Sequence, residues 1–281
     1  DARIKLLQVP AGDSGKKKAL NQGIREARGT LIVTTDADCF APSGWLKSIV
    51  GVYESKNPAF IASPVVFAKD HSALERFQAL DLLGTMVLTG VGIHKSWFYL
   101  ANGANLSFPK EVFLSAGGDE GIDRIASGDD MLLLHKIVRK YPGRIAFNKS
   151  LEATVVTHPE RNFRDFFWQR IRWAGKTGTY TDRRLQTLVV GVFFLSAFIL
   201  LAPVILFLTK AVFLWKVYFL AASLKLLADW LILDAGMKYF SRMDLRSFFL
   251  RAQFYHLLYI TGIGSLSLLL KKYPWKGRKL R

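Results

Sequence analysis

The chain has 281 residues, which is long enough for one large domain or two smaller ones. Hydrophobic residues make up 51% of it, a high share for a water-soluble protein, and this predicts a membrane segment. Lysine and arginine total 39 against 22 acidic residues, and the formal net charge of +17 indicates an anionic partner: nucleic acid, anionic lipid or a phosphate-bearing substrate. The single cysteine, Cys39, excludes an intrachain disulfide and a cysteine-based metal site.

Up to about residue 182, short apolar runs alternate with amphipathic stretches, which predicts a layered α/β domain. The expected strands are residues 4–9, 31–35, 60–67 and 154–157. The expected helices are residues 16–28, 43–55, 72–88, 110–117, 129–140 and 162–176. The run 31–35 is nearly all apolar and β-branched, so we expect a parallel strand covered on both faces. Because the chain enters its first strand almost at once, we expect a fragment whose opening part is missing.

Long apolar windows dominate the rest of the chain, and residues 185–270 are expected to form a membrane region with two or three helices. Residues 185–208 carry no charge, and a spanning helix needs about 20 apolar residues. The windows 211–233 and 248–270 are interrupted by charges or histidine and predict membrane helices less strongly.

Basic residues lie before the first window and in the tail, residues 271–281, which places both ends on the cytoplasmic side. Both ends inside require an even number of crossings, so we expect the window 248–270 to lie in the interface or to re-enter.

Two carboxylates, Asp36 and Asp38, follow the strand expected at residues 31–35. Ligands of open α/β sheets bind beyond the carboxyl ends of the strands. Neighbouring carboxylates repel each other unless a cation lies beside them, and Mg²⁺ or Mn²⁺ commonly bridges carboxylates to substrate phosphates. The pattern therefore predicts a metal–diphosphate site, and a solvated loop after a strand is the other interpretation.

Two further clusters lie at expected helix starts. Lys16, Lys17 and Lys18 begin one helix, where phosphate binds readily, although a solvated charge run has the same pattern. Asp129 and Asp130 begin another. Acidic residues in a first turn are ordinary capping residues, and the functional alternative is that Asp130 is a general base for an acceptor hydroxyl.

The stretch FWQRIRWAGK, residues 167–176, places Gln169, Arg172 and Trp173 on one helix face, since their spacing is i, i+3, i+4. An amide, a guanidinium and an indole together suit sugar and phosphate, because the indole stacks and the arginine pairs with an anion. The other interpretation is an interfacial helix just before a membrane span.

The order of these pieces, GKKKALNQG, DAD, NGAN, GDD and QRIRW followed by apolar helices, resembles membrane-bound family 2 glycosyltransferases. The motif pattern is similar to that of cellulose, hyaluronan and chitin synthases. The resemblance covers about residues 1–180 and implies a GT-A, Rossmann-like nucleotide-diphospho-sugar transferase domain over residues 1–182, with its first part missing. The family's segment with a nucleotide-base-binding acidic residue would lie before Asp1.

The resemblance also implies roles for single residues. Asp36 and Asp38 match the D-x-D that holds the divalent metal, Mg²⁺ or Mn²⁺, and the donor diphosphate. Asp130 matches the catalytic base, and the segment around it reads S-G-D-D, so that Asp129 stands where glutamate is more usual. The remaining matches are Lys18 and Asn21 in the segment that lines the nucleotide pocket, and Gln169, Arg172 and Trp173, which with Asp129 border the acceptor and the diphosphate.

We therefore expect an inverting, metal-dependent hexosyl transfer from a UDP- or GDP-sugar to a hydroxyl of a lipid-linked or polysaccharide acceptor. The expected location is the inner cell membrane, crossed several times, with the catalytic domain in the cytoplasm and in contact with membrane lipid. One alternative is a polyprenyl-phosphate glycosyl transferase, and another is an inactive membrane scaffold of the same fold. A membrane-tethered nucleic-acid binder is disfavoured, because the aspartate pairs would repel nucleic acid.

Overall fold

The computed structural model describes residues 4–9, 16–68, 71–118, 129–175, 178, 180–210, 212–270, 273–275 and 278–280. The chain forms two compact units. The first consists of Asp1–Pro64 and Leu100–Val155, and the second of Val65–Tyr99 and Val156–Arg281. That residues 1–182 act as one catalytic domain stays a prediction.

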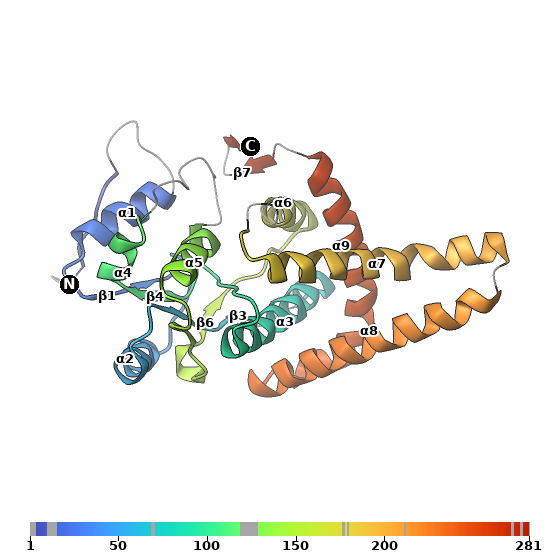
Figure 1. The fold of residues 1–281 in the computed structure, drawn as a ribbon, viewed down its shortest axis with the longest axis horizontal. Coiled ribbons are helices and arrows are strands. Elements are labelled where there is room, and N and C mark those ends of the chain that lie inside the picture. The colour runs from blue at the N-terminus through green and yellow to red at the C-terminus, as the bar shows by residue number, and fades with distance from the viewer. Residues whose placement is uncertain are drawn as a thin grey trace. The chain divides into compact units, whose positions relative to one another are not determined.

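The first unit is built on a four-stranded mixed sheet with the order β1-β4-β2-β5 (Figure 1). The strands are β1 (Leu31–Thr34), β4 (Leu106–Pro109), β2 (Phe60–Ala62) and β5 (Ile145–Phe147). β4 runs antiparallel to β1 and β2, and β2 runs parallel to β5. The carboxyl ends of β1, β2 and β5 therefore share one edge of the sheet with the amino end of β4. We call this edge, where Thr34 pairs with Leu106, the carboxyl edge.

Helices cover both faces of this sheet, as the α/β prediction requires. The helices of the first unit are α1 (Lys16–Glu26), α2 (Trp45–Lys56), α4 (Lys110–Ser115), α5 (Asp129–Lys140) and the short η1 (Leu151–Ala153). Ile49 of α2 packs with Ile61 and Ala146 on one face. Alternate residues of a strand point to opposite faces, so the neighbour of Ile61 packs on the other face, in the stacked aromatic series Phe60, Phe108 and Phe113.

Three strand predictions need correction, and the first concerns strand type. The run 31–35 forms β1, which is antiparallel to β4 and not parallel. Ile32 is buried on one face, and Leu31 and Val33 pack against the Ile49, Ile61 and Ala146 cluster on the other, so the strand is covered on both faces as expected. A short apolar, β-branched run suits either strand type, and pairing is decided by distant residues.

The second correction concerns residues 60–67, which form two strands, β2 and β3 (Val65–Phe67), and not one. The break falls at Ser63 and Pro64, and proline has no N–H to donate to a ladder.

The third correction concerns residues 4–9, which form no strand. Side chains tie this segment to α1: Lys5 donates to Glu26 at 2.6 Å, and Gln22 donates to the Gln8 carbonyl at 3.2 Å. The Lys5 ammonium lowers the pKa of the Glu26 carboxyl below its usual value.

The second unit is mainly helical. Its long helices are α3 (Ala73–Lys95), α6 (Phe163–Ala174), α7 (Arg183–Thr209), α8 (Val212–Tyr239) and α9 (Phe249–Leu269), with a short η3 (Met243–Phe248) before α9. β3 pairs with β6 (Val155–Thr157), and the expected tail holds β7 (Tyr273–Trp275) and β8 (Arg278–Leu280), whose side chains lie outside the described residues. α3, α6, α8 and η3 share one hydrophobic core, which includes Phe77, Leu80, Leu83, Phe166, Met237, Leu245 and Phe248.

Among the residues that the structure describes, two helices, α3 and α7, are long and apolar enough to cross a membrane. They differ in burial: 56% of the apolar window of α3 is buried within the protein, against 17% for α7. α3 is therefore the central helix of its unit, whereas α7 presents an apolar surface outward. α8 also presents apolar side chains outward. The exposed apolar side chains of α7 and α8 include Phe194, Phe198, Leu201, Phe207, Phe213, Phe219, Leu220 and Leu227. α8 and α9 are helices as expected, but α3 and α7 are the spans that the described residues support by length and composition.

Candidate active site

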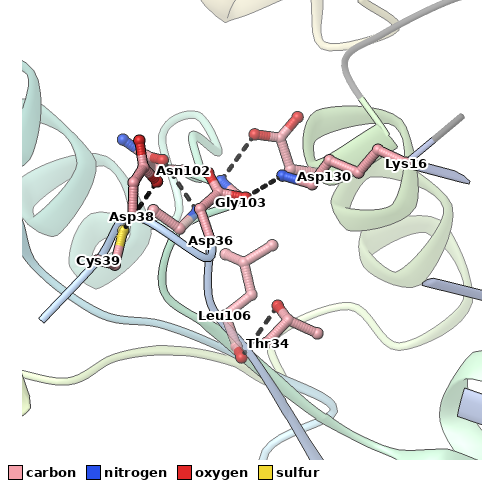
Figure 2. Close-up of polar contacts among 10 residues, drawn as sticks. Lys16, Thr34, Asp36, Asp38, Cys39, Asn102, Gly103, Leu106 and Asp130 are labelled. Atoms are coloured by element: carbon pink, nitrogen blue, oxygen red, sulfur yellow. Dashed lines mark hydrogen bonds and ion pairs between the residues drawn. The ribbon is translucent and has the colours of Figure 1, made fainter. Parts of the chain in front are cut away.

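Asp36 and Asp38 lie directly beyond β1, at the carboxyl edge. The Cys39 amide donates to the Asp36 carbonyl at 3.1 Å, which closes a turn over both aspartates. The Asp36 carboxylate forms an ion pair with Lys16, and the Cys39 thiol lies 4.0 Å from an Asp38 oxygen (Figure 2). Asp36 is partly buried and Asp38 is exposed, so both carboxylates remain accessible to a ligand.

The partner of Asp36 is the first residue of α1, a helix with no acidic residue in its first turn. Lys18 and Asn21, which were predicted to line a nucleotide pocket, lie on the same helix. The structure therefore places the basic run at a helix start whose first lysine contacts the D-x-D motif.

Asp130 reaches the same edge from a distant part of the chain. It is the second residue of α5, and its Oδ2 accepts a hydrogen bond of 2.8 Å from the Gly103 amide (Figure 2). Its Oδ1 accepts from the Met131 amide at 2.9 Å. Gly103 lies just before β4, and β4 begins where β1 ends, because Leu106 pairs with Thr34. The side chain of Asp129 lies outside the described residues.

The carboxyl edge thus gathers three aspartates, Asp36, Asp38 and Asp130, from two separate segments. Among the residues that the structure describes, no group of three or more His, Cys, Asp and Glu could hold a metal ion by itself. Two carboxylates fit Mg²⁺ or Mn²⁺ only when substrate oxygens and water complete the coordination, which is how Mg²⁺ is usually held beside phosphates. The residues present fit a metal that arrives with a diphosphate.

Gln169, Arg172 and Trp173 lie in the second unit, on α6, at the predicted spacing and all partly buried. Gln169 donates to Glu160 at 2.8 Å, while its own carbonyl oxygen is buried and accepts no hydrogen bond from a described residue. Residue 176, the expected end of this helix, lies outside the described residues.

Arg170, inside the same motif, was missed by sequence reasoning. It is 4% exposed, forms a 2.8 Å ion pair with Asp81 of α3, and lies over the Trp173 ring with 4.3 Å to the centroid. The available signal was Asp81 itself, because it is the one carboxylate in the long apolar stretch of α3 between Arg76 and His94, and a buried carboxylate needs a cation as its partner.

The whole chain was also compared with known families. The model of glycosyl transferase family 21 matches residues 1–281. The chain belongs to glycosyl transferase family 21. No curated protein matches it. The predicted class of enzyme, a glycosyltransferase, is confirmed, and the family matched is family 21, whereas the motif order resembles family 2.

As a member of family 21, the protein transfers a sugar from a donor to an acceptor. The family match spans both units, so it covers the carboxyl edge, the α6 motif and the apolar helices alike. In the part of the chain that the structure describes, α7 is one of two helices with the length and composition of a membrane span, which indicates membrane association.

Proposed function

We propose that this family 21 protein is an inverting, metal-dependent glycosyltransferase with a GT-A catalytic domain, related in motif pattern to the family 2 enzymes. It would move a hexose from a UDP- or GDP-sugar to a hydroxyl of a lipid-linked or polysaccharide acceptor. The observation that carries the proposal is the gathering of Asp36, Asp38 and Asp130 at the carboxyl edge of one sheet.

Asp36 and Asp38 are proposed to hold Mg²⁺ or Mn²⁺ together with the donor diphosphate. The metal supplies positive charge that stabilises the leaving diphosphate. Lys16 pairs with Asp36 and is half-exposed. Its ammonium would therefore lie beside a phosphate bound at Asp36 and Asp38. Lys18 and Asn21, further along α1, are proposed to line the nucleotide pocket.

Asp130 is proposed as the general base. It takes the proton from the acceptor hydroxyl, and that oxygen attacks the anomeric carbon from the face opposite the diphosphate. The bond from the anomeric carbon to the diphosphate breaks, and the nucleoside diphosphate leaves with the electron pair. Attack from the opposite face inverts the anomeric configuration.

Gln169, Arg172 and Trp173, with Asp129, are proposed to border the acceptor and the diphosphate. An arginine pairs with phosphate oxygens, and an indole stacks on a sugar face. The buried carbonyl oxygen of Gln169 supports this role, because a sugar hydroxyl could satisfy it.

The helices α7, α8 and α9 are proposed to hold the enzyme in the inner membrane. The exposed apolar side chains of α7 and α8 would face lipid, where their exposure carries no cost. The basic residues of positions 271–281 would bind anionic lipid on the cytoplasmic side, where nucleotide sugars are made.

A transfer assay tests this function with the full chain in nanodiscs. A panel of UDP- and GDP-hexoses would be supplied with Mn²⁺ and a membrane lipid extract, and the anomeric configuration of the product would be read by NMR. We expect one donor to react, with inversion, and chelation by EDTA to stop the reaction. Retention of configuration, or full activity with EDTA, would contradict the proposal.

A further inference from the structure

The loop Asn102–Asn105, which reads NGAN, precedes β4 and has no part in the reaction described above. It is a tight turn: the Asn105 amide donates to the Asn102 carbonyl at 3.0 Å. The Asn102 side-chain oxygen accepts from the Ala104 amide at 3.1 Å. These two bonds fix the conformation of the loop from within.

Asn105 anchors the loop to the rest of the first unit. It is fully buried, and its Nδ2 donates to the carbonyls of Pro64 and Ala153 at 2.8 and 2.7 Å. Its Oδ1 accepts from the Trp45 indole at 3.0 Å. Three different segments therefore hold this one amide, and every donor it has is satisfied.

Gly103, at the tip of the loop, faces the carboxylate of Asp130. Its amide donates to Oδ2 at 2.8 Å. A Cβ at Gly103 would lie 3.3 Å from the same oxygen and 3.6 Å from Cβ and Cγ of Asp130. The contact is thus closer than a side chain permits without a shift of a few tenths of an ångström.

Resting on the proposed role of Asp130 as the base, we propose that Gly103 is a positioning residue that fixes the plane of the Asp130 carboxylate. The Gly103 amide holds Oδ2, and the Met131 amide holds Oδ1. An ionised carboxylate has about four lone-pair sites, so each oxygen keeps one for a proton. Two backbone amides hold the base in one orientation before the acceptor binds. A near-attack geometry requires such an orientation, because no rotation of the carboxylate then has to be frozen out during the reaction.

The variant Gly103→Ala tests the proposal, because alanine adds one carbon against Oδ2. A misplacement of about 1 Å can cost about 10²-fold in rate, so a smaller shift should lower kcat about 10-fold. Binding of the reactive hexose donor with Mn²⁺, measured by calorimetry, should stay within about two-fold, and the unfolding temperature within about 2 °C. A kcat equal to that of the wild type would overturn the proposal.

Gly51→Ala is the matched control. Gly51 lies in α2 with no atom within 4 Å of an added Cβ. Alanine there should leave kcat unchanged and stabilise the helix slightly. An equal loss of kcat in both variants would mean that any added methyl group disturbs the unit, and it would overturn the assignment to Gly103.

Two comparisons separate failure of this inference from failure of the proposed function. If Asp130→Asn keeps the wild-type rate, the proposed base is wrong. If it loses the rate, adding Gly103→Ala to it should cost nothing more, because both changes act through one carboxylate, and an additional 10-fold loss would overturn the positioning role.

Amide hydrogen exchange of residues 100–106 needs no substrate. Asparagine keeps an oxygen that can accept from the Gly103 amide, whereas alanine does not. Exchange should therefore be faster in Asp130→Ala than in Asp130→Asn, and equal exchange would show that the Gly103 bond does not hold the loop.

Discussion

Two carboxylate–cation pairs, one in each unit, each include a residue of a sequence motif: Asp36 of the D-x-D and Arg170 of QRIRW. In the first unit, the side chains of Lys16 and Asp36 are 52% and 38% exposed. In the second, those of Arg170 and Asp81 are 4% and 15% exposed. The chemistry of the pairs is similar, and the difference is the water around them.

This difference decides what each pair can do. An exposed pair contributes about 0–1 kcal/mol, so Asp36 can exchange its lysine for another cation at little cost. A buried pair cannot do this, since removing one partner leaves an uncompensated charge. Accessible charge therefore suits the ligand site that we propose at the carboxyl edge, and buried charge fixes α6 against α3.

The largest expected effect is on catalysis. Asp130→Asn keeps the shape of the side chain but removes the base, so transfer should fall by about 10²–10⁴-fold. Donor binding should stay unchanged. Rates would be measured by release of the nucleoside diphosphate, with calorimetry of the donor on the same preparation.

The control for this variant is the exposed carboxylate of Glu54 on α2, where Glu54→Gln should have no effect. Near-normal transfer by Asp130→Asn would contradict the base assignment. It would favour an acceptor that needs no base, such as a polyprenyl phosphate.

The next effect is on stability, at the buried pair. Asp81→Asn leaves Arg170 buried without its counter-charge and should lower the free energy of unfolding by about 3–5 kcal/mol. Chemical denaturation in detergent would measure it.

The double variant Asp81→Asn with Arg170→Met removes both charges and should be more stable than Asp81→Asn alone. If the double variant loses as much free energy of unfolding as Asp81→Asn and Arg170→Met lose together, the two side chains do not act as a pair.

A smaller effect is expected where α7 packs against α9. An added Cβ at Gly264 would lie 2.5 Å from the Phe193 ring, so Gly264→Ala should destabilise the protein by about 1–3 kcal/mol. Gly262, two residues earlier on α9, has no atom within 4 Å, and Gly262→Ala should be neutral or stabilising. Equal thermal stability of the two variants would show that α7 and α9 do not pack closely.

The smallest effect is expected at the exposed pair. Lys16→Met should change the free energy of unfolding by less than about 1 kcal/mol. It should strengthen the binding of Mn²⁺ alone, which would be followed by the electron paramagnetic resonance signal of the free ion, because Asp36 is freed. A loss of several kcal/mol, or weaker Mn²⁺ binding, would remove the contrast between the two pairs.

Sequence patterns predicted the elements whose signal is local. The helix expected at residues 129–140 forms over Asp129–Lys140, and Asp36 and Asp38 follow a strand as predicted. The antiparallel pairing of β1 was not predictable, because the sequence of a four-residue strand does not indicate which strand it pairs with or in which direction.

The contacts missed by sequence reasoning are those between distant segments. The bond from Gly103 to Asp130 uses a backbone amide, which every residue but proline has, so no residue type signals it. Arg170 was overlooked since a motif defined by Gln169, Arg172 and Trp173 ignores the residue on the buried face between them.

The most direct test of the account is calorimetric titration of UDP- and GDP-hexoses into the full chain in nanodiscs, with Mn²⁺ and with EDTA, for wild type and Asp38→Ala. The account predicts that one donor binds only with Mn²⁺, and that Asp38→Ala weakens this binding by at least about 10-fold. Donor binding that is unchanged by EDTA and by Asp38→Ala would contradict a metal–diphosphate site at the carboxyl edge.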